Sequence, residues 1–364
     1  MYEIMTSDEA IRLIRDGDCI CVNSFVGIEN PVELHEALYR RYQKMQSPTH
    51  LTIVSSAGFG VWDTEHNAEG YIRDGAVDRL ICGHFGAMMS TKKLVLEDRF
   101  EAYNLPLGCI SHAIRAQAGG LSGALSKVGL DIFVDPRLEG PGINRVSIDD
   151  SLVKHVEVDG EEFLYYKLPK ITIALIKGTA ADHKGNITFD DMFMSGDALS
   201  ICQAVKANRG KVIVQVDRLV DTPSRPRNAI IPGCLVDAIV VAEPQERNEA
   251  YTALTGSFEI PYEEWHIWSE KIDQASEKML KDNTIGKIIG RRAAKELRVD
   301  DIVNIGIGIP EMVSRYARKS GMLDMVTLTV ESGGIGGFPV SGEAFGAMIG
   351  TVATSFMLAT TASS

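Results

Sequence analysis

The sequence predicts an α/β fold with two related open α/β domains, the second of them incomplete. Three observations support this prediction. Apolar strand-like runs alternate with helical periodicity, one strand–loop–helix–strand pattern occurs twice, and far less chain follows the second copy than the first. The length of 364 residues fits about two domains, and 45% hydrophobic against 24% charged residues is typical of a globular chain.

The first copy of the pattern opens with an amphipathic helix over 7–16, for which Ser7 is the expected N-cap. A buried strand, a loop, a helix with one apolar face and a second strand follow, namely 19–22, 27–31, the helix containing Leu34, Leu38 and Tyr42, and 51–54. The second strand runs directly into Ser55.

The second copy repeats this order nearer the carboxyl terminus. Its elements are a helix with Ile285, Ile288 and Ile289 at helical spacing, a strand over 302–305, a loop over 306–310, a helix containing Met312 and Tyr316, and a strand over 325–330. The two Gly-Ile-x-x-Pro loops are 279 residues apart and the two strand ends are 276 residues apart. Two matches in the same order indicate two related units, and strands over 171–176, 212–216 and 238–242 are expected between them.

The pattern predicts an N-terminal α/β domain over 1–262, a helical connector over 263–283 and the start of a second α/β domain over 284–347. The remaining residues, 348–364, form an atypical tail without charge. The stretch after Glu343 has 21 uncharged residues, close to the length of a membrane span. Seven of them are Ser or Thr and no basic residue flanks them, so we expect no span.

Charge and cysteine content exclude several classes of function. A net charge of −12 is unlike that of a general nucleic-acid binder, which has a basic face. The six cysteines form no CxxC pair, and the amino terminus lacks the apolar run of a signal peptide, which together predict a cytoplasmic protein with reduced thiols. No metal-ligand spacing, phosphate-binding loop or serine-hydrolase elbow occurs.

Glu331 is the strongest candidate for a catalytic group. It ends an apolar strand and precedes a glycine turn, and ligands of open α/β sheets collect at the carboxyl ends of strands. A carboxylate there can act as a base or a covalent nucleophile; the alternative is a glutamate that only caps the turn. The corresponding place in the first copy is Ser55, so the two halves are not chemically equal.

Glycines that follow strands are the second candidate group, because their backbone N–H groups can approach an anion or a developing oxyanion. The candidate backbone donors are Gly27, Gly306, Ile307, Gly308, Gly333 and Gly334. Gly306 and Gly308 lack the third glycine of a dinucleotide fingerprint, since Glu311 occupies its place. A tight strand-to-helix turn with Pro310 at the first helical position is the structural alternative.

Several segments together resemble the class I CoA-transferases, in particular the single-chain acetate/propionate (short-chain acyl) type. They are Ala102 to Pro106, Phe133 to Arg137, Thr179 to Asp182, Asn304 to Pro310 and Val330 to Gly333. The resemblance implies ping-pong transfer of CoA from an acyl-CoA to a short-chain carboxylate such as acetate. Glu331 would form an acyl-glutamyl anhydride and then a glutamyl-CoA thioester. It further implies CoA as a substrate, no permanently bound cofactor and a homo-oligomer.

Two departures from the family leave alternatives open. Leu107 stands where the family commonly has a glutamine that can donate a hydrogen bond, and the resemblance fades after Ala347, although the family continues well past the nucleophile. The second domain is therefore expected to be truncated. The alternatives are a CoA-thioester hydrolase and an inactive remnant that binds CoA or a partner subunit.

Overall fold

A computed structural model describes most of the chain. The described residues are 2–25, 27, 29–59, 69–86, 88–190, 192, 194–222, 224–243, 284–306, 308–330, 334–336, 338–339, 348–349 and 355–356. The chain divides into two compact units between residues 249 and 250. The expected domain boundary at 262 and the expected connector lie outside the described residues, as does most of the 348–364 tail.

The first unit is built on a ten-stranded sheet. Eight of its strands follow the order β1-β13-β11-β9-β2-β3-β4-β5, and every neighbouring pair along this path is parallel. The strands of this path are β1 (Glu3–Ile4), β2 (Cys19–Val22), β3 (Leu51–Ser55), β4 (Val77–Cys82), β5 (Glu101–Asn104), β9 (Ile173–Asp182), β11 (Lys211–Val220) and β13 (Ala238–Val241). The short strands β10 (Ile187–Thr188) and β12 (Ala229–Ile231) pair antiparallel beside β9.

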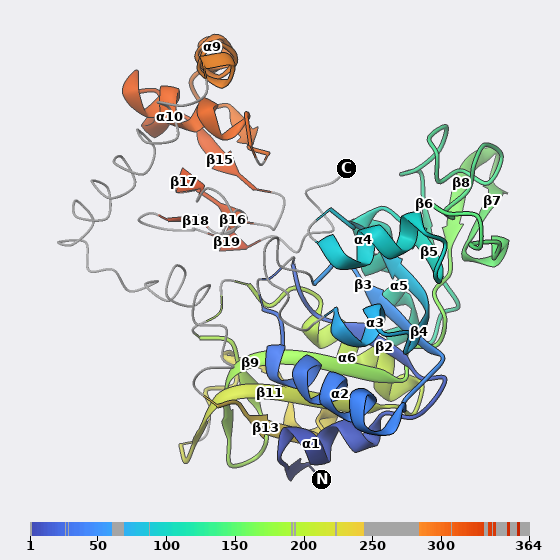
Figure 1. Ribbon diagram of the computed structural model, residues 1–364. Coiled ribbons are helices and arrows are strands. Elements are labelled where there is room, and N and C mark those ends of the chain that lie inside the picture. Colours follow the sequence, from blue (N-terminus) through green and yellow to red (C-terminus); the bar gives the residue numbers. More distant parts are fainter. Residues whose placement is uncertain are drawn as a thin grey trace. The chain divides into compact units, whose positions relative to one another are not determined.

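Helices cover both faces of this sheet (Figure 1). One face is packed by α1 (Ser7–Ala10), α2 (Val32–Met45), α3 (Gly70–Arg73) and α4 (Met89–Leu96), and the other by α5 (Leu107–Ala118) and α6 (Ala198–Ala207). Strand residues alternate between the two cores: Cys19 and Cys21 pack with α5 and α6, whereas Ile20 packs with α2. Five of the six cysteines are buried and Cys234 is exposed.

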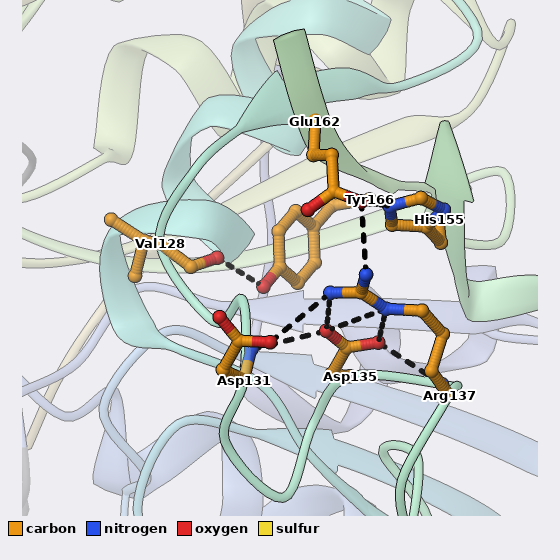
Figure 2. Close-up of polar contacts among 7 residues, drawn as sticks. All are labelled: Val128, Asp131, Asp135, Arg137, His155, Glu162 and Tyr166. Atoms are coloured by element: carbon orange, nitrogen blue, oxygen red, sulfur yellow. Dashed lines mark hydrogen bonds and ion pairs between the residues drawn. The ribbon is translucent and has the colours of Figure 1, made fainter. Parts of the chain in front are cut away.

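A small antiparallel sheet, in the order β6-β8-β7, extends from the first unit. It comprises β6 (Ala124–Ser126), β7 (Val153–Val158) and β8 (Glu161–Tyr166). Beneath it, Arg137 forms a two-pronged ion pair with the buried Asp135, with Nε 3.0 Å from Oδ1 and Nη2 2.7 Å from Oδ2 (Figure 2). The hydrogen bonds from Arg137 hold the pKa of Asp135 well below its ordinary value.

An outer carboxylate and a histidine extend this network, and a tyrosine lies beside it. Arg137 Nη1 donates to Glu162 Oε1 at 3.1 Å, and His155 Nε2 lies 3.2 Å from the same oxygen. The Tyr166 hydroxyl donates to the Val128 carbonyl at 2.7 Å. The Asp135–Arg137 motif therefore fixes the loop before β7 to strand β8 of the small sheet.

The second unit contains helices α9 (Thr284–Ala293) and α10 (Glu311–Lys319) and a sheet in the order β14-β15-β16-β19. Its strands are β14 (Ile302–Asn304), β15 (Thr327–Thr329), β16 (Gly334–Ile335) and β19 (Ser355–Phe356), and β17 (Phe338–Pro339) pairs with β18 (Met348–Ile349). β14 and β15 are parallel with α10 between them in the chain. This repeats the β2–α2–β3 order of the first unit, as the sequence predicts.

The structure corrects three details of the sequence analysis. Thr6, not Ser7, is the N-cap of α1: its hydroxyl accepts from the Glu9 N–H while the Glu9 carboxylate accepts from the Thr6 N–H. The expected 7–16 helix ends early, as α1 and a 3₁₀ turn over Ile11–Leu13. Strand 171–176 is instead Ile173–Asp182, because it continues into the hairpin with β10.

The apolar residues of α9 are not buried as the helical spacing suggests. Ile285 and Ile288 are 68% and 65% exposed, whereas Gly286 and Gly290 are buried, and a Cβ at Gly290 would lie 2.3 Å from the Met312 Cβ of α10. The helix therefore contacts α10 through its glycines. Within the described ranges, no helix is both long and apolar enough to cross a bilayer.

Candidate functional site

The loop after β2 lies at the carboxyl edge of the large sheet and contains Gly27. Two residues on, Glu29 has φ +61°, a left-handed backbone that is rare for residues other than glycine, and its side chain is buried. Asn30 Nδ2 donates to the Phe59 carbonyl at 2.8 Å, which ties this loop to the loop after β3. The predicted glycine loop is thus a constrained turn with buried polar side chains.

A polar cluster at the same edge escaped the sequence analysis. Asp197, directly before α6, accepts hydrogen bonds from the hydroxyls of Ser56, at 3.1 Å, and Ser111. Its backbone N–H donates to Asn23 Oδ1 at 3.0 Å, and Arg115 Nη2 lies 3.8 Å from its carboxylate. An aspartate before an apolar helical run is an N-cap signal, but its contacts come from three distant segments and cannot be read from spacing.

Charged and amide groups are also buried beneath the start of α2. Lys177 is 2% exposed in the central strand β9 and is the register partner of Gln215 in β11. Gln215 Oε1 accepts from the Glu33 N–H at 3.1 Å, so one side chain of the sheet satisfies a free amide of the α2 amino terminus. Lys177 follows directly after the strand expected over 171–176, and residue spacing alone gave no reason to expect a buried polar contact there.

His35 is the most strongly perturbed histidine of the described chain. It is fully buried, its ring lies nearly parallel to those of Phe59 and Tyr71, and its Nδ1 lies 3.1 Å from the Tyr71 hydroxyl. Burial lowers the pKa of His35 to about 3, so the ring is neutral at physiological pH. No three or more His, Cys, Asp or Glu side chains of the described residues gather in a way that could hold a metal ion.

Asn104 and Leu107 belong to the motif at the end of β5. Asn104 Nδ2 donates to the carbonyls of Cys82 and Gly83, each at 3.0 Å, which joins the ends of β5 and β4. Leu107 begins α5 next to Gly83, where an added Cβ would lie 3.3 Å from the Leu107 Cβ. The motif therefore brings an apolar side chain to the carboxyl edge.

In the second unit, the glycine loop follows β14. Gly308 has φ +87°, and its N–H donates to the Glu311 carboxylate at 2.7 Å. Pro310 is the N-cap of α10, one residue before the first helical position. Gly306 precedes Ile307, which lies outside the described residues.

The ends of β14 and β15 lie next to each other, because the Ile305 N–H donates to the Thr329 carbonyl at 2.8 Å. The Val330 N–H donates to the Gly334 carbonyl at 3.0 Å, and both residues are buried. Glu331 and Gly333 themselves lie outside the described residues. Gly306 and Glu331 therefore follow directly after two neighbouring parallel strand ends.

Parallel sheets with glycine loops and buried polar groups at their carboxyl edges define the class of open α/β proteins that bind ligands at that edge. A family model described as coenzyme A transferase matches residues 4–242. The chain belongs to the coenzyme A transferase family, and this confirms the resemblance found in its sequence.

Relatives match almost the whole chain. It is 36% identical over 350 residues to acetate CoA-transferase YdiF of Escherichia coli K12 and 34% identical over 347 residues to caffeate CoA-transferase of Acetobacterium woodii. These matches cover 96% and 95% of this chain and 64% of each relative. The chain thus spans slightly less than two thirds of the length of these relatives.

A crystal structure has the same fold. Acyl-CoA transferase YdiF from E. coli O157:H7, in a thioester complex with CoA, superimposes with a TM-score of 0.81 at 32% identity, covering 96% of this chain and 65% of that one. The mixed α/β architecture expected from the sequence is therefore confirmed.

Proposed function

We propose that the chain transfers coenzyme A between an acyl-CoA and a free short-chain carboxylate such as acetate. The observation that carries this proposal is the match over 96% of the chain to an acetate CoA-transferase, together with the match to a caffeate CoA-transferase over 95%. Both names specify a carboxylate as the species to which CoA is attached. The CoA thioester in the related crystal structure supports CoA as a substrate.

In the proposed mechanism, Glu331 is the nucleophile. Its carboxylate attacks the thioester carbon, the C–S bond breaks, and CoA thiolate leaves an acyl-glutamyl anhydride. The thiolate then attacks the glutamyl carbonyl and the anhydride C–O bond breaks, which releases the first carboxylate and leaves a glutamyl-CoA thioester. An incoming carboxylate takes the CoA by the same two steps in reverse.

The paired strand ends support this assignment. Glu331 directly follows the buried Val330, and Gly306 follows the neighbouring strand. Backbone amides of Gly306, Ile307, Gly333 and Gly334 are the proposed donors to the oxyanions, and Gly27 is a proposed substrate-binding amide of the first unit. A missing oxyanion donor costs about 3–4 kcal/mol of transition-state stabilisation in enzymes. Assembly of identical chains remains a proposal, to be tested by native mass.

The test is covalent. The protein is incubated with acetyl-CoA or propionyl-CoA without an acceptor. Its intact mass is measured before and after borohydride treatment, and the modified peptide is then mapped. We expect a mass gain of one CoA less one water, on the peptide with Glu331, and loss of the adduct when acetate is added. Glu331→Gln should form no adduct, whereas Glu296→Gln, at an exposed glutamate of the same unit, should form it normally.

An unmodified, folded wild-type protein would overturn the mechanism. Steady release of free CoA without an acceptor would instead indicate thioester hydrolysis, because water would then have intercepted the same intermediates.

A further inference from the structure

The loop between β14 and α10 is held by one of its own side chains. The Gly308 N–H donates to Glu311 Oε1 at 2.7 Å, and the Glu311 N–H donates back to the Gly308 carbonyl at 3.1 Å. Gly308 has φ +87°, so the loop reverses direction at this residue. The amide of Gly308 is therefore engaged by Glu311 rather than open to a ligand.

The carboxylate of Glu311 is buried, with only 2% of the residue exposed. Among the described residues its second oxygen, Oε2, has no hydrogen-bond partner, and it lies 3.9 Å from Arg315 Nη2, one helical turn further along α10. Arg315 is also buried, and this burial lowers the pKa of its guanidinium. A buried carboxylate with one unsatisfied oxygen is costly, and such groups in native structures call for an explanation beyond packing.

The described part of the first unit has no equivalent of this contact. At the 279-residue offset, Gly308 corresponds to Glu29, which is also left-handed at φ +61°, while Glu311 corresponds to Val32. The loop of the first unit is fixed instead by the Asn30 side chain on the Phe59 carbonyl. The two loops share a backbone feature, but their carboxylates act differently: Glu29 Oε1 accepts from the distant Met194 N–H at 3.3 Å, whereas Glu311 accepts from the Gly308 N–H of its own loop.

We propose that Glu311 is a positioning residue that latches the 306–310 loop by holding the Gly308 N–H. Gly308 then serves the shape of the loop, and the amide of Gly306 is left to contact an acyl-CoA oxygen. The role of the loop in binding acyl-CoA rests on the proposed function. The hydrogen bond between Glu311 and Gly308 does not depend on it. Arg315 stabilises the latch by lying beside the free carboxylate oxygen.

Two variants separate the latch from simple burial. Glu311→Gln retains an oxygen that can accept from Gly308, and Glu311→Met retains the volume without such an oxygen. We expect Glu311→Met to lower kcat by about tenfold, the size of one hydrogen bond lost in the transition state, with little change in KM for acyl-CoA. Glu311→Gln should restore most of kcat, and Glu296→Gln is the matched surface control.

Amide hydrogen exchange resolved at Gly308 provides a readout that does not depend on activity. We expect a protected Gly308 amide in the wild type and in Glu311→Gln, and faster exchange in Glu311→Met. Unchanged exchange in Glu311→Met, or a kcat that rises because the amide becomes available to the ligand, would overturn the proposal. If Glu311→Met does not fold, a rapidly exchanging Gly308 amide in the wild type still overturns it.

These results separate the latch from the proposed function. A wild-type protein without adduct or turnover would remove the CoA-transferase mechanism, and the exchange data would still decide whether Glu311 holds the loop.

Discussion

In the first unit β2 lies between β9 and β3, and all four of its residues are buried. In the second unit β14 is an edge strand among the described strands, and its Ile302 is 78% exposed. The preceding helices differ in the same way: Ile11 is fully buried, whereas Ile285 is 68% exposed. Similar local sequence patterns thus produce the same elements, but the neighbouring strands decide how much apolar surface those elements bury.

The largest expected difference between the halves is chemical. Glu331→Gln should lower turnover by about a thousandfold or more, because an amide cannot form the anhydride. Ser55→Ala, at the corresponding place in the first half, should leave turnover within about twofold, because the Ser55 hydroxyl is buried and makes no hydrogen bond with the described part of the chain. Steady-state assays with acyl-CoA and acetate measure both variants, and equal losses would contradict the asymmetry.

Core truncations should show the next largest difference. Ile20→Ala, in the buried β2, should lower the free energy of unfolding by about 2–5 kcal/mol, through lost burial and a cavity. Ile302→Ala, in β14, should change it by less than about 0.5 kcal/mol. Urea unfolding followed by circular dichroism compares the two, and similar losses would show that β14 is covered in solution.

Acid should destabilise the first unit through His35. The folded-state pKa of about 3 lies below the ordinary value of 6.5, so the unfolded chain binds the proton first as pH falls. The contribution of neutral His35 to the free energy of unfolding is fully present above pH 6.5 and is lost as pH falls toward 3. The loss reaches about 2 kcal/mol near pH 5. His35→Phe retains a stacked ring and should flatten this part of the stability profile; an unchanged slope would assign the acid sensitivity to other groups.

Helix-end contacts should give the smallest difference. Thr6→Ala removes the cap of α1 and should cost about 1 kcal/mol of stability. Glu296 lies just after α9 and forms an ion pair with Arg292 of that helix. Glu296→Ala should lower the free energy of unfolding by less than about 0.5 kcal/mol, since both side chains are about two-thirds exposed. Thermal unfolding of the two variants ranks the contacts, and the reverse order would show that the exposed pair is unusually rigid.

Local patterns predicted the elements well because periodicity and turn residues act over a few positions. The strands at 19–22 and 238–242 and the helix containing Leu34 lie where alternation and helical spacing placed them. The N-cap of α1 was assigned one residue late, because adjacent Thr6 and Ser7 offer equivalent hydroxyls and only the Glu9 contact distinguishes them.

The polar groups of the site depend on contacts that spacing does not contain. Asp197 gathers Ser56 and Ser111 from segments 141 and 86 residues away. The exposed face of α9 was missed for a similar reason, since helical spacing indicates an apolar face but not whether anything covers it.

The cysteines determine how the proposed reaction can be observed. Burial raises the pKa of five thiols, those of Cys19, Cys21, Cys82, Cys109 and Cys202. Only the thiolate form reacts readily with disulfide reagents, so these five should react slowly. Cys234 is exposed, so the native chain should offer one fast-reacting thiol to a colorimetric reagent. Liberated CoA can then be counted against a fixed background of one equivalent per chain, and a fluorophore on Cys234 labels a single known position.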